Sequence, residues 1–200
     1  RYSDGHAQII REDCIDCGEC VVTCPRHSQQ SWPDVKEILR QIRSGRQVVA
    51  SVAPSFIADF DVGSIEDLRE ALFQLGFFDV QEMAIGAEIV SREYEKLIRS
   101  GERDVVISSA CPPIIQLIRK YYPEMLRYLA PVETPMEVHC KMLREQYPDA
   151  FIVAVSPCFA ERAVMNETGC CDSMLMFSDL KRWMHEMGVR PVNHGFAVVR

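Results

Sequence analysis

One short stretch decides how the whole chain is interpreted: Cys14-Ile15-Asp16-Cys17-Gly18-Glu19-Cys20-Val21-Val22-Thr23-Cys24-Pro25. Two, two and three residues separate its successive cysteines, and a proline follows the last one. This is the spacing of thiolates that hold a [4Fe–4S] cluster. A zinc site or a disulfide-rich patch is the alternative, but zinc sites usually combine two separated cysteine pairs or add histidine. The stretch therefore predicts a [4Fe–4S] cluster on its cysteines, Cys14, Cys17, Cys20 and Cys24.

The run is of the ferredoxin type, and it leaves two patterns of ligation open. In proteins with two such clusters, the fourth cysteine of a run ligates the other cluster. The chain begins at Arg1, and none of the residues before Cys14 is a cysteine. We therefore expect a piece of a two-cluster module, in which Cys14, Cys17 and Cys20 hold one cluster and Cys24 belongs to the other. In the alternative pattern, all four cysteines hold a single cluster.

Composition argues against several classes of protein. The chain has 200 residues, 22 of them basic and 29 acidic, with a net charge of −7 and no basic run, which argues against nucleic acid as a partner. No apolar stretch reaches the length of a membrane span. The nine cysteines are an odd number in a chain that is not tiny, so a disulfide framework is not favoured. A reducing cytoplasm is the compartment that we expect for thiolate-bound clusters.

The hydrophobic pattern changes after residue 33. Residues 1–33 contain a turn signal at Asp4-Gly5 and the cysteine run, and they end in Trp32-Pro33. From residue 34 onward, helical periodicity alternates with short apolar runs. Strands are expected at 47–53, 80–84, 104–109, 151–155 and 173–176, and helices near 34–43, 64–75, 86–99, 113–122, 134–147 and 178–187. We therefore predict an α/β fold with a mainly parallel sheet flanked by helices at 34–200, and a small ferredoxin-like iron–sulfur segment at 1–33.

Two further cysteines, Cys111 and Cys158, each follow a predicted strand and precede a predicted helix. Ligands of open parallel sheets bind at the carboxyl ends of the strands, and a helix N-terminus favours a thiolate. The two thiols are therefore candidates for one shared metal centre, and the alternative is that each is a small buried hydrophobic residue. Cys140 is most simply a packing residue, and the adjacent Cys170 and Cys171 are most simply loop thiols.

The order of these segments resembles the [FeFe]-hydrogenase large-subunit family, in which ferredoxin clusters precede an α/β domain that holds the hydrogen-activating cluster. Residues 108–112, Ser-Ser-Ala-Cys-Pro, resemble that family's T-S-C-C-P motif, and residues 156–160, Ser-Pro-Cys-Phe-Ala, resemble M-P-C-x-A-K. Weaker similarities lie at 52–56, 86–90 and 173–180. The resemblance implies a hydrogenase-type iron cluster with Cys111 and Cys158 among its four thiolates. It also implies that its pocket is lined by Pro54, Ser109, Pro157 and Glu161.

The departures from the family pattern bear on activity. Ala110 stands where active members have a cysteine that relays protons. Glu161 stands where they have a lysine that donates a hydrogen bond to the cluster, and a carboxylate only accepts. Val164 stands where they have an acid of the proton path, and the motif that supplies the last two thiolates is not found before Arg200. We therefore expect this chain alone to be inactive as a hydrogenase.

Three functions follow from the resemblance. The first is an iron–sulfur redox protein that acts as a hydrogenase-like sensor or electron-transfer component, which we favour because the Ala110-Cys111 variant resembles members regarded as sensory. The second is catalytic oxidation of hydrogen and reduction of protons. The third is a non-catalytic scaffold for iron–sulfur assembly. The expected partner is an electron-transfer or signalling protein, with no nucleic acid and no membrane span.

Overall fold

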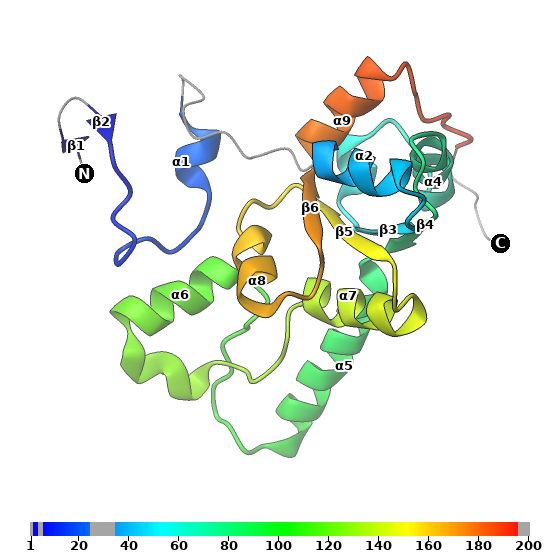
Figure 1. Ribbon diagram of the computed structural model, residues 1–200. Coiled ribbons are helices and arrows are strands. Elements are labelled where there is room, and N and C mark those ends of the chain that lie inside the picture. The colour runs from blue at the N-terminus through cyan, green and yellow to red at the C-terminus, as the bar shows by residue number, and fades with distance from the viewer. Residues whose placement is uncertain (1, 4–5, 25–34, 196–200) are drawn as a thin grey trace.

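The computed structural model describes residues 2–3, 6–24 and 35–195, and a four-stranded parallel sheet lies at its centre (Figure 1). The order of the strands is β4-β3-β5-β6, and each neighbouring pair is parallel. Their bounds are β3 Val48–Val52, β4 Asp79–Glu82, β5 Phe151–Ser156 and β6 Ser173–Met176. Every residue of β3 and β5 is buried, because helices cover both faces of these central strands. The predicted α/β fold with a mainly parallel sheet is confirmed.

The helices form a layer on each side of the sheet (Figure 1). On one face, α7 (Pro135–Gln146) packs on β3 and β5, and α5 (Ala84–Ser100) packs against α7. On the other face, α2 (Val35–Arg43) packs on β3 and against α9 (Phe177–Glu186). The remaining helices are α3 Phe56–Asp59, α4 Ile65–Gln74, α6 Pro112–Tyr121, α8 Glu161–Thr168 and a 3-10 turn, η1, at Pro123–Tyr128.

Local sequence signals explain where several helices begin. Ser64 accepts a hydrogen bond from the Asp67 amide at the start of α4, and Asp67 accepts one from the Ser64 amide in return. Thr134 and Glu137 form the same reciprocal pair at the start of α7. Each pair satisfies amides that a helix leaves without partners at its first turn. These caps therefore fix where the two helices begin, immediately after Ser64 for α4 and after Thr134 for α7.

One predicted strand was wrong. Residues 104–109 form no strand of the sheet, and their single bridge joins Ile107 to Leu129, with the Ile107 amide 2.7 Å from the Tyr128 carbonyl oxygen. The segment lies beside η1, away from both edge strands, β4 and β6 (Figure 1). Val105 is 51% exposed, so the apolar run does not enter the core as a buried strand would. Cys111 therefore follows an irregular segment rather than a strand end.

The N-terminal segment is short and mostly irregular. β1 (Tyr2–Ser3) pairs antiparallel with β2 (His6–Ala7), and α1 covers Glu19–Val22. The predicted turn at Asp4-Gly5, Pro25 and the predicted domain boundary near residue 33 lie outside the described residues. Among the described helices, none has the combined length and apolar character that crossing a bilayer requires.

Candidate functional site

The four N-terminal cysteines lie on one loop and the helix that follows it. Cys14 and Cys17 belong to the loop, Cys20 to α1, and Cys24 lies just beyond α1. Asp16 and Gly18 both have positive φ, 56° and 77°, so the backbone turns sharply on either side of Cys17. The Asp16 amide points at the Cys14 sulfur at 3.4 Å, which is the kind of hydrogen bond that cluster thiolates receive. The loop therefore fits a bound iron–sulfur cluster.

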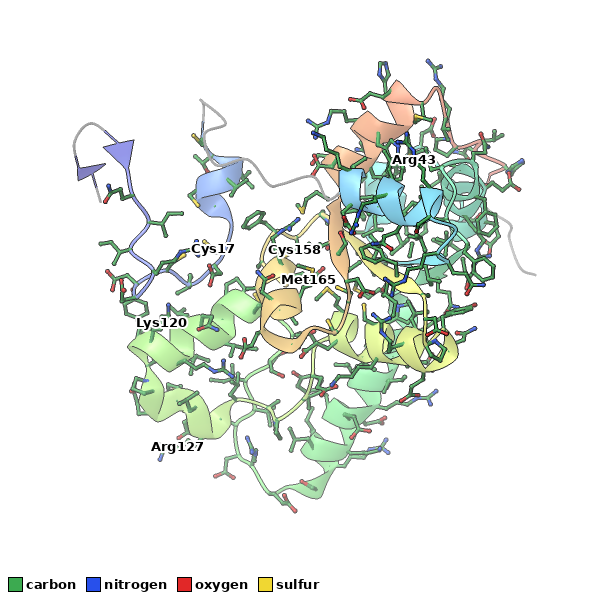
Figure 2. The ribbon with its side chains drawn as sticks, viewed as in Figure 1. Cys17, Arg43, Lys120, Arg127, Cys158 and Met165 are labelled. Carbon is green, nitrogen blue, oxygen red and sulfur yellow. The ribbon has the colours of Figure 1, made fainter. Side chains whose placement is uncertain are left out.

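This loop rests on the α/β domain through two sets of contacts. From α6, Lys120 Nζ donates to the carbonyl oxygens of Cys14 and Arg11 at 2.5 and 3.1 Å, and Tyr121 Oη donates to that of Asp13 at 2.9 Å. Beside α1, Gly18 is buried against Phe159, the residue after Cys158. Figure 2 shows Cys17 in this loop and Cys158 ahead of α8. The thiol run is thus held next to the second predicted site.

Cys111 and Cys158 both lie at helix N-termini. Cys111 caps α6, and the Cys158 carbonyl oxygen accepts from the Glu161 amide at the first turn of α8. The pKa of Cys158 is raised, chiefly by burial and then by the negative charge of Glu161, while the amides of Ala160 and Glu161 act in the opposite direction. Cys111 contributes the smallest of the effects that raise this pKa. That these two cysteines share one metal centre stays a prediction.

Cys158 also lies at the place in the sheet where ligands bind in this class of fold. The chain runs from β3 to β4 on one side and then returns to β5 on the other side of β3. The carboxyl ends of β3 and β5 therefore form a topological switch point. Cys158 follows β5 and Pro54 follows β3 at this edge, and the Ala53 amide still pairs with the Val155 carbonyl oxygen at 2.8 Å.

Glu161 occupies the first turn of α8 with its carboxyl largely inside the protein. Burial raises the pKa of this carboxyl, the hydrogen bond with Ser156 lowers it, and negative charge on Cys170 raises it. Its Oε2 atom is buried without a hydrogen-bond partner among the described residues. A lone pair at that point can accept a proton or bind a cation, but it donates no hydrogen bond unless the carboxyl is protonated. Glu161 thus lies near both Cys158 and Cys170.

The other predicted pocket residues have different surroundings. Pro54 and Pro157 are exposed beyond β3 and β5. Ser109 is buried, and its hydroxyl lies 2.9 Å from the Tyr94 hydroxyl and 2.5 Å from the Val132 carbonyl oxygen. It lines a cavity of about 280 Å³ between α6, α7 and α8 that neither Cys111 nor Cys158 lines. Ser109 therefore holds the Cys111 loop in place, and its predicted role toward a cluster stays a prediction.

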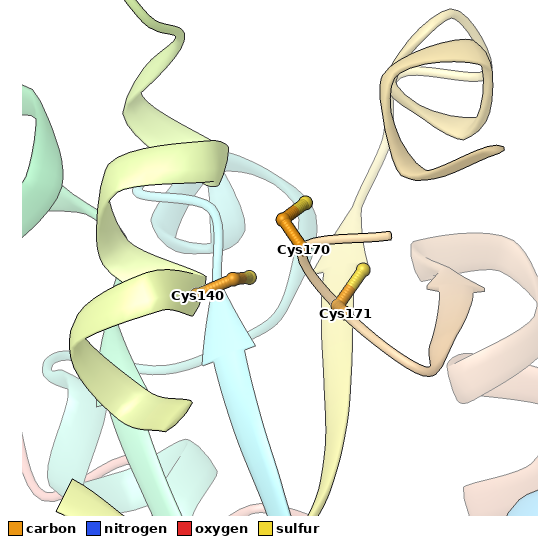
Figure 3. Close-up of side chains that lie close together, drawn as sticks. All are labelled: Cys140, Cys170 and Cys171. Carbon is orange, nitrogen blue, oxygen red and sulfur yellow. The ribbon is translucent and has the colours of Figure 1, made fainter. Parts of the chain in front are cut away.

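Three cysteines that the sequence assigned to packing or to a loop lie together in the core. Cys140 on α7 and the adjacent Cys170 and Cys171, between α8 and β6, have sulfur atoms within 4.8 Å of one another (Figure 3). All three are buried, at 0%, 7% and 5% exposure. Among the described residues, no other three histidine, cysteine or acidic side chains gather as closely. In the sequence, the adjacent Cys170 and Cys171 were the available sign of this cluster. Cys140, which completes it, lies far from them along the chain.

The fold and the thiol run define a class of protein, and comparison with known families identifies it. Residues 46–194 match the family model of the iron-only hydrogenase large subunit, C-terminal domain, and residues 7–28 match the 4Fe-4S binding domain. The chain belongs to the iron-only hydrogenase large-subunit family. It is a hydrogenase-like iron–sulfur protein, as the sequence predicted.

The similar proteins are of two kinds, iron–sulfur cluster assembly factors and hydrogenases. The chain is 23% identical over 179 residues to the cytosolic Fe-S cluster assembly factor NAR1 of Yarrowia lipolytica, covering 78% of this chain and 36% of that protein. It is 28% identical over 142 residues to iron hydrogenase 1 of Clostridium pasteurianum, covering 62% and 25%. A solved [FeFe]-hydrogenase, studied for oxygen inactivation of its H cluster, matches with a TM-score of 0.67, 20% identity, and coverage of 82% and 51%. The chain thus spans about a quarter to a third of these curated relatives.

Proposed function

We propose that this chain is a hydrogenase-like electron-transfer component of the sensory kind. The N-terminal thiols, at residues 1–33, would hold a [4Fe–4S] cluster, and Cys111 and Cys158 of the α/β domain, at 34–200, would hold a second iron–sulfur group. These groups would supply one-electron transfer. One observation carries the proposal: the thiol loop packs directly on Phe159, the residue next to Cys158. The cytoplasm is the proposed compartment, and an electron-transfer or signalling protein is the proposed partner.

The chain supplies the surroundings of these groups. When bound, the N-terminal cluster supplies one-electron chemistry, and the other functions belong to protein groups. Lys120 and Tyr121 donate hydrogen bonds to the loop carbonyls and so tie the loop to α6. The amides of Ala160 and Glu161 partly offset the burial and the Glu161 charge that raise the pKa of Cys158, and the thiolate is the form that binds iron.

Residues around the second site argue against hydrogen turnover. Ala110 has no titratable group, and Val164 is a buried apolar side chain in α8. Neither can pass a proton, whereas the resembling family places a cysteine and an acid at these positions. Glu161 offers an unpartnered carboxyl oxygen where the family has a cationic donor. The proposed role therefore keeps the redox groups and omits fast proton delivery.

The test begins with anaerobically prepared protein. Iron and sulfide are measured, and EPR spectra are recorded after reduction with dithionite. A reduced [4Fe–4S] signal that Cys17→Ser abolishes and Thr23→Ala retains is expected. Cys111→Ser and Cys158→Ser are expected to lower iron content further without removing that signal. Hydrogen evolution by the maturated chain would overturn the non-catalytic role, and zinc in place of iron on the N-terminal run would overturn the redox role.

A second candidate function is iron–sulfur assembly, because several of the similar proteins are named cytosolic assembly factors. The two functions differ in what leaves the protein. An electron carrier retains its iron while it reduces an electron acceptor, whereas an assembly factor passes iron and sulfide to an apo-protein. Incubation of the loaded chain with an apo-ferredoxin, followed by iron analysis of both proteins, separates them. Electron transfer with retained iron is expected.

A further inference from the structure

The buried cluster of Cys140, Cys170 and Cys171, here called the thiol trio, has the geometry of a metal-ion site. Zn–S bonds of about 2.3 Å place the sulfurs of a tetrahedral site about 3.8 Å apart. The trio's sulfurs lie within 4.8 Å of one another, so an ion would draw them together by no more than about 1 Å. Ligands so close in space suit a single ion and leave no room for an iron–sulfur cube between them.

The trio is fixed by contacts that do not involve sulfur. Arg144 lies one turn after Cys140 on α7, and its guanidinium is 2.6 Å from Asp172 Oδ2, immediately after Cys171. The same carboxylate oxygen accepts from the Ile152 amide of β5 at 2.8 Å. Asp172 therefore ties the Cys170–Cys171 loop both to α7 and to the sheet. The two chain segments that carry the thiols are held together before any ion arrives.

Polar groups also point at the sulfurs. The Cys171 amide forms a hydrogen bond to Cys170, and the Ala154 amide forms one to Cys171. The Thr168 hydroxyl accepts from the Cys170 amide at 3.3 Å and donates to the Val164 carbonyl oxygen, so it fixes the backbone beside the Cys170 thiol. Within the trio, the thiols of Cys140 and Cys171 donate hydrogen bonds to Cys170. Hydrogen bonds of this kind around the ligands orient them and tune a metal site. Simple packing of small apolar residues would not require them.

We propose that the thiol trio binds one thiophilic metal cation, Zn²⁺ or Cu⁺, as a structural ion that joins α7 to the loop before β6. Both cations prefer thiolate ligands. Three thiolates with Zn²⁺ leave a net charge of −1, and with Cu⁺ a net charge of −2. Because burying charge in an apolar core is costly, Zn²⁺ is the ion expected in the protein as isolated. The site is separate from the N-terminal run and from the pair formed by Cys111 and Cys158.

The experiment uses the full chain. Digestion with trypsin places the trio thiols and the N-terminal thiols in different peptides, so each set can be quantified by itself. The trio lies in peptides ending at Lys141 and Lys181, whereas the N-terminal run lies between Arg11 and Arg26. The protein is prepared anaerobically, stripped of metal, and divided into portions with no metal, with Zn²⁺ and with Cu⁺. Each portion is alkylated in moderate urea, which gives the reagent access to the buried thiols, and is then digested. The trio peptides are quantified by mass spectrometry. Protection by Zn²⁺ or by Cu⁺ identifies the ion.

A matched pair of variants tests the ligands. Cys170→Ala is expected to lower metal affinity by more than roughly 100-fold, since losing even an outer partner of a metal site costs about 10–100-fold. Cys111→Ala removes one thiol elsewhere, and it is expected to leave the trio's affinity and protection unchanged. Unaltered alkylation of wild-type trio peptides in both metals would overturn the proposal, even if Cys170→Ala fails to fold. So would a Cys140–Cys170 disulfide that forms in place of metal binding.

Discussion

Gly18 lies so close to Phe159 that a Cβ atom on Gly18 would be 2.7 Å from the Phe159 Cβ and 2.9 Å from its Cδ1. This packing joins a residue between two thiols of the N-terminal run to the residue after Cys158. Because Gly18 also has a φ of 77°, glycine is favoured there both by backbone conformation and by space. The contact between the two thiol regions therefore depends on the absence of a side chain at Gly18.

Replacing Gly18 with alanine is expected to undock the N-terminal loop. The new methyl group clashes with Phe159, and the clash is relieved most easily if the loop moves away from the domain. Hydrogen exchange of the amides at 14–24 is expected to accelerate by on the order of tenfold or more, since the loop loses its contact with Phe159. Mass spectrometry of peptides from this segment measures the change.

Gly45→Ala is the matched control. Gly45 has a φ of 81°, and no atom lies within 4 Å of a Cβ built there. Both substitutions carry a left-handed backbone cost of about 1–2 kcal/mol, but only the change at Gly18 adds a steric clash. Equal exchange at 14–24 in the two variants would show that the Phe159 contact does not hold the loop.

The reactivity of Cys158 in iron-free protein is expected to rise in Glu161→Gln. The negative charge of Glu161 raises the pKa of Cys158, so removing this charge increases the fraction of thiolate at neutral pH. Because a thiolate of lower pKa is also a weaker nucleophile, the gain in alkylation rate is a few-fold rather than the full change in thiolate fraction. Alkylation kinetics of the Cys158 peptide provide the measurement, and Glu167→Gln, at an exposed site on α8, is the control.

Gly86→Ala is expected to lower the free energy of unfolding although alanine favours helices. A Cβ at Gly86 would lie 2.3 Å from the Pro135 carbonyl oxygen and 2.9 Å from the His139 Cβ, where α5 crosses α7. Overpacking of this kind costs about 1–3 kcal/mol, which exceeds the gain in helix propensity of about 1 kcal/mol. Urea unfolding measures it, with the exposed Glu88→Ala as control. A stabilised Gly86→Ala would mean that the helices separate freely.

His194→Ala is expected to destabilise the protein in a pH-dependent way. His194 Nδ1 lies 2.7 Å from Asp67 Oδ1, and this hydrogen bond raises the pKa of His194 above 6.5 and lowers that of Asp67 below 3.8. The histidine's contribution is full below pH 6.5 and fades as pH rises through its folded pKa, and the aspartate's contribution fades only in acid. The loss in urea midpoint should therefore be larger at pH 5–6 than above pH 8. His185→Ala, an exposed histidine on α9, should show no such difference.

Local patterns were enough to predict most of the fold. The apolar runs at 47–53 and 151–155 became the buried central strands, and Ser64 capped α4 as its residue type indicated. The run at 104–109 also has a short apolar stretch, but it lies beside η1 without a neighbouring strand, so it forms one bridge. Strand formation depends on a partner that the sequence of the segment does not contain.

The sites were predictable to different degrees. Residue spacing alone indicated the N-terminal run, because its ligands are neighbours in sequence. The pairing of Cys111 with Cys158 rested on the predicted order of strands and helices. It stays a prediction, because Cys111 follows an irregular segment and only Cys158 follows a strand of the sheet. The thiol trio was missed, because Cys140 has the helical spacing of a packing residue and meets its partners only after α7 crosses β5.

The pairing of Val48 with Phe151 has a consequence for the order of events during synthesis. The first central strand leaves the ribosome long before its neighbour, so the middle of the sheet stays open until β5 has been made. Phe159 is translated later still, and the thiol loop, which is made earlier, has no docking surface until then. A nascent chain therefore exposes these cysteines before the surface against which their loop packs has been made.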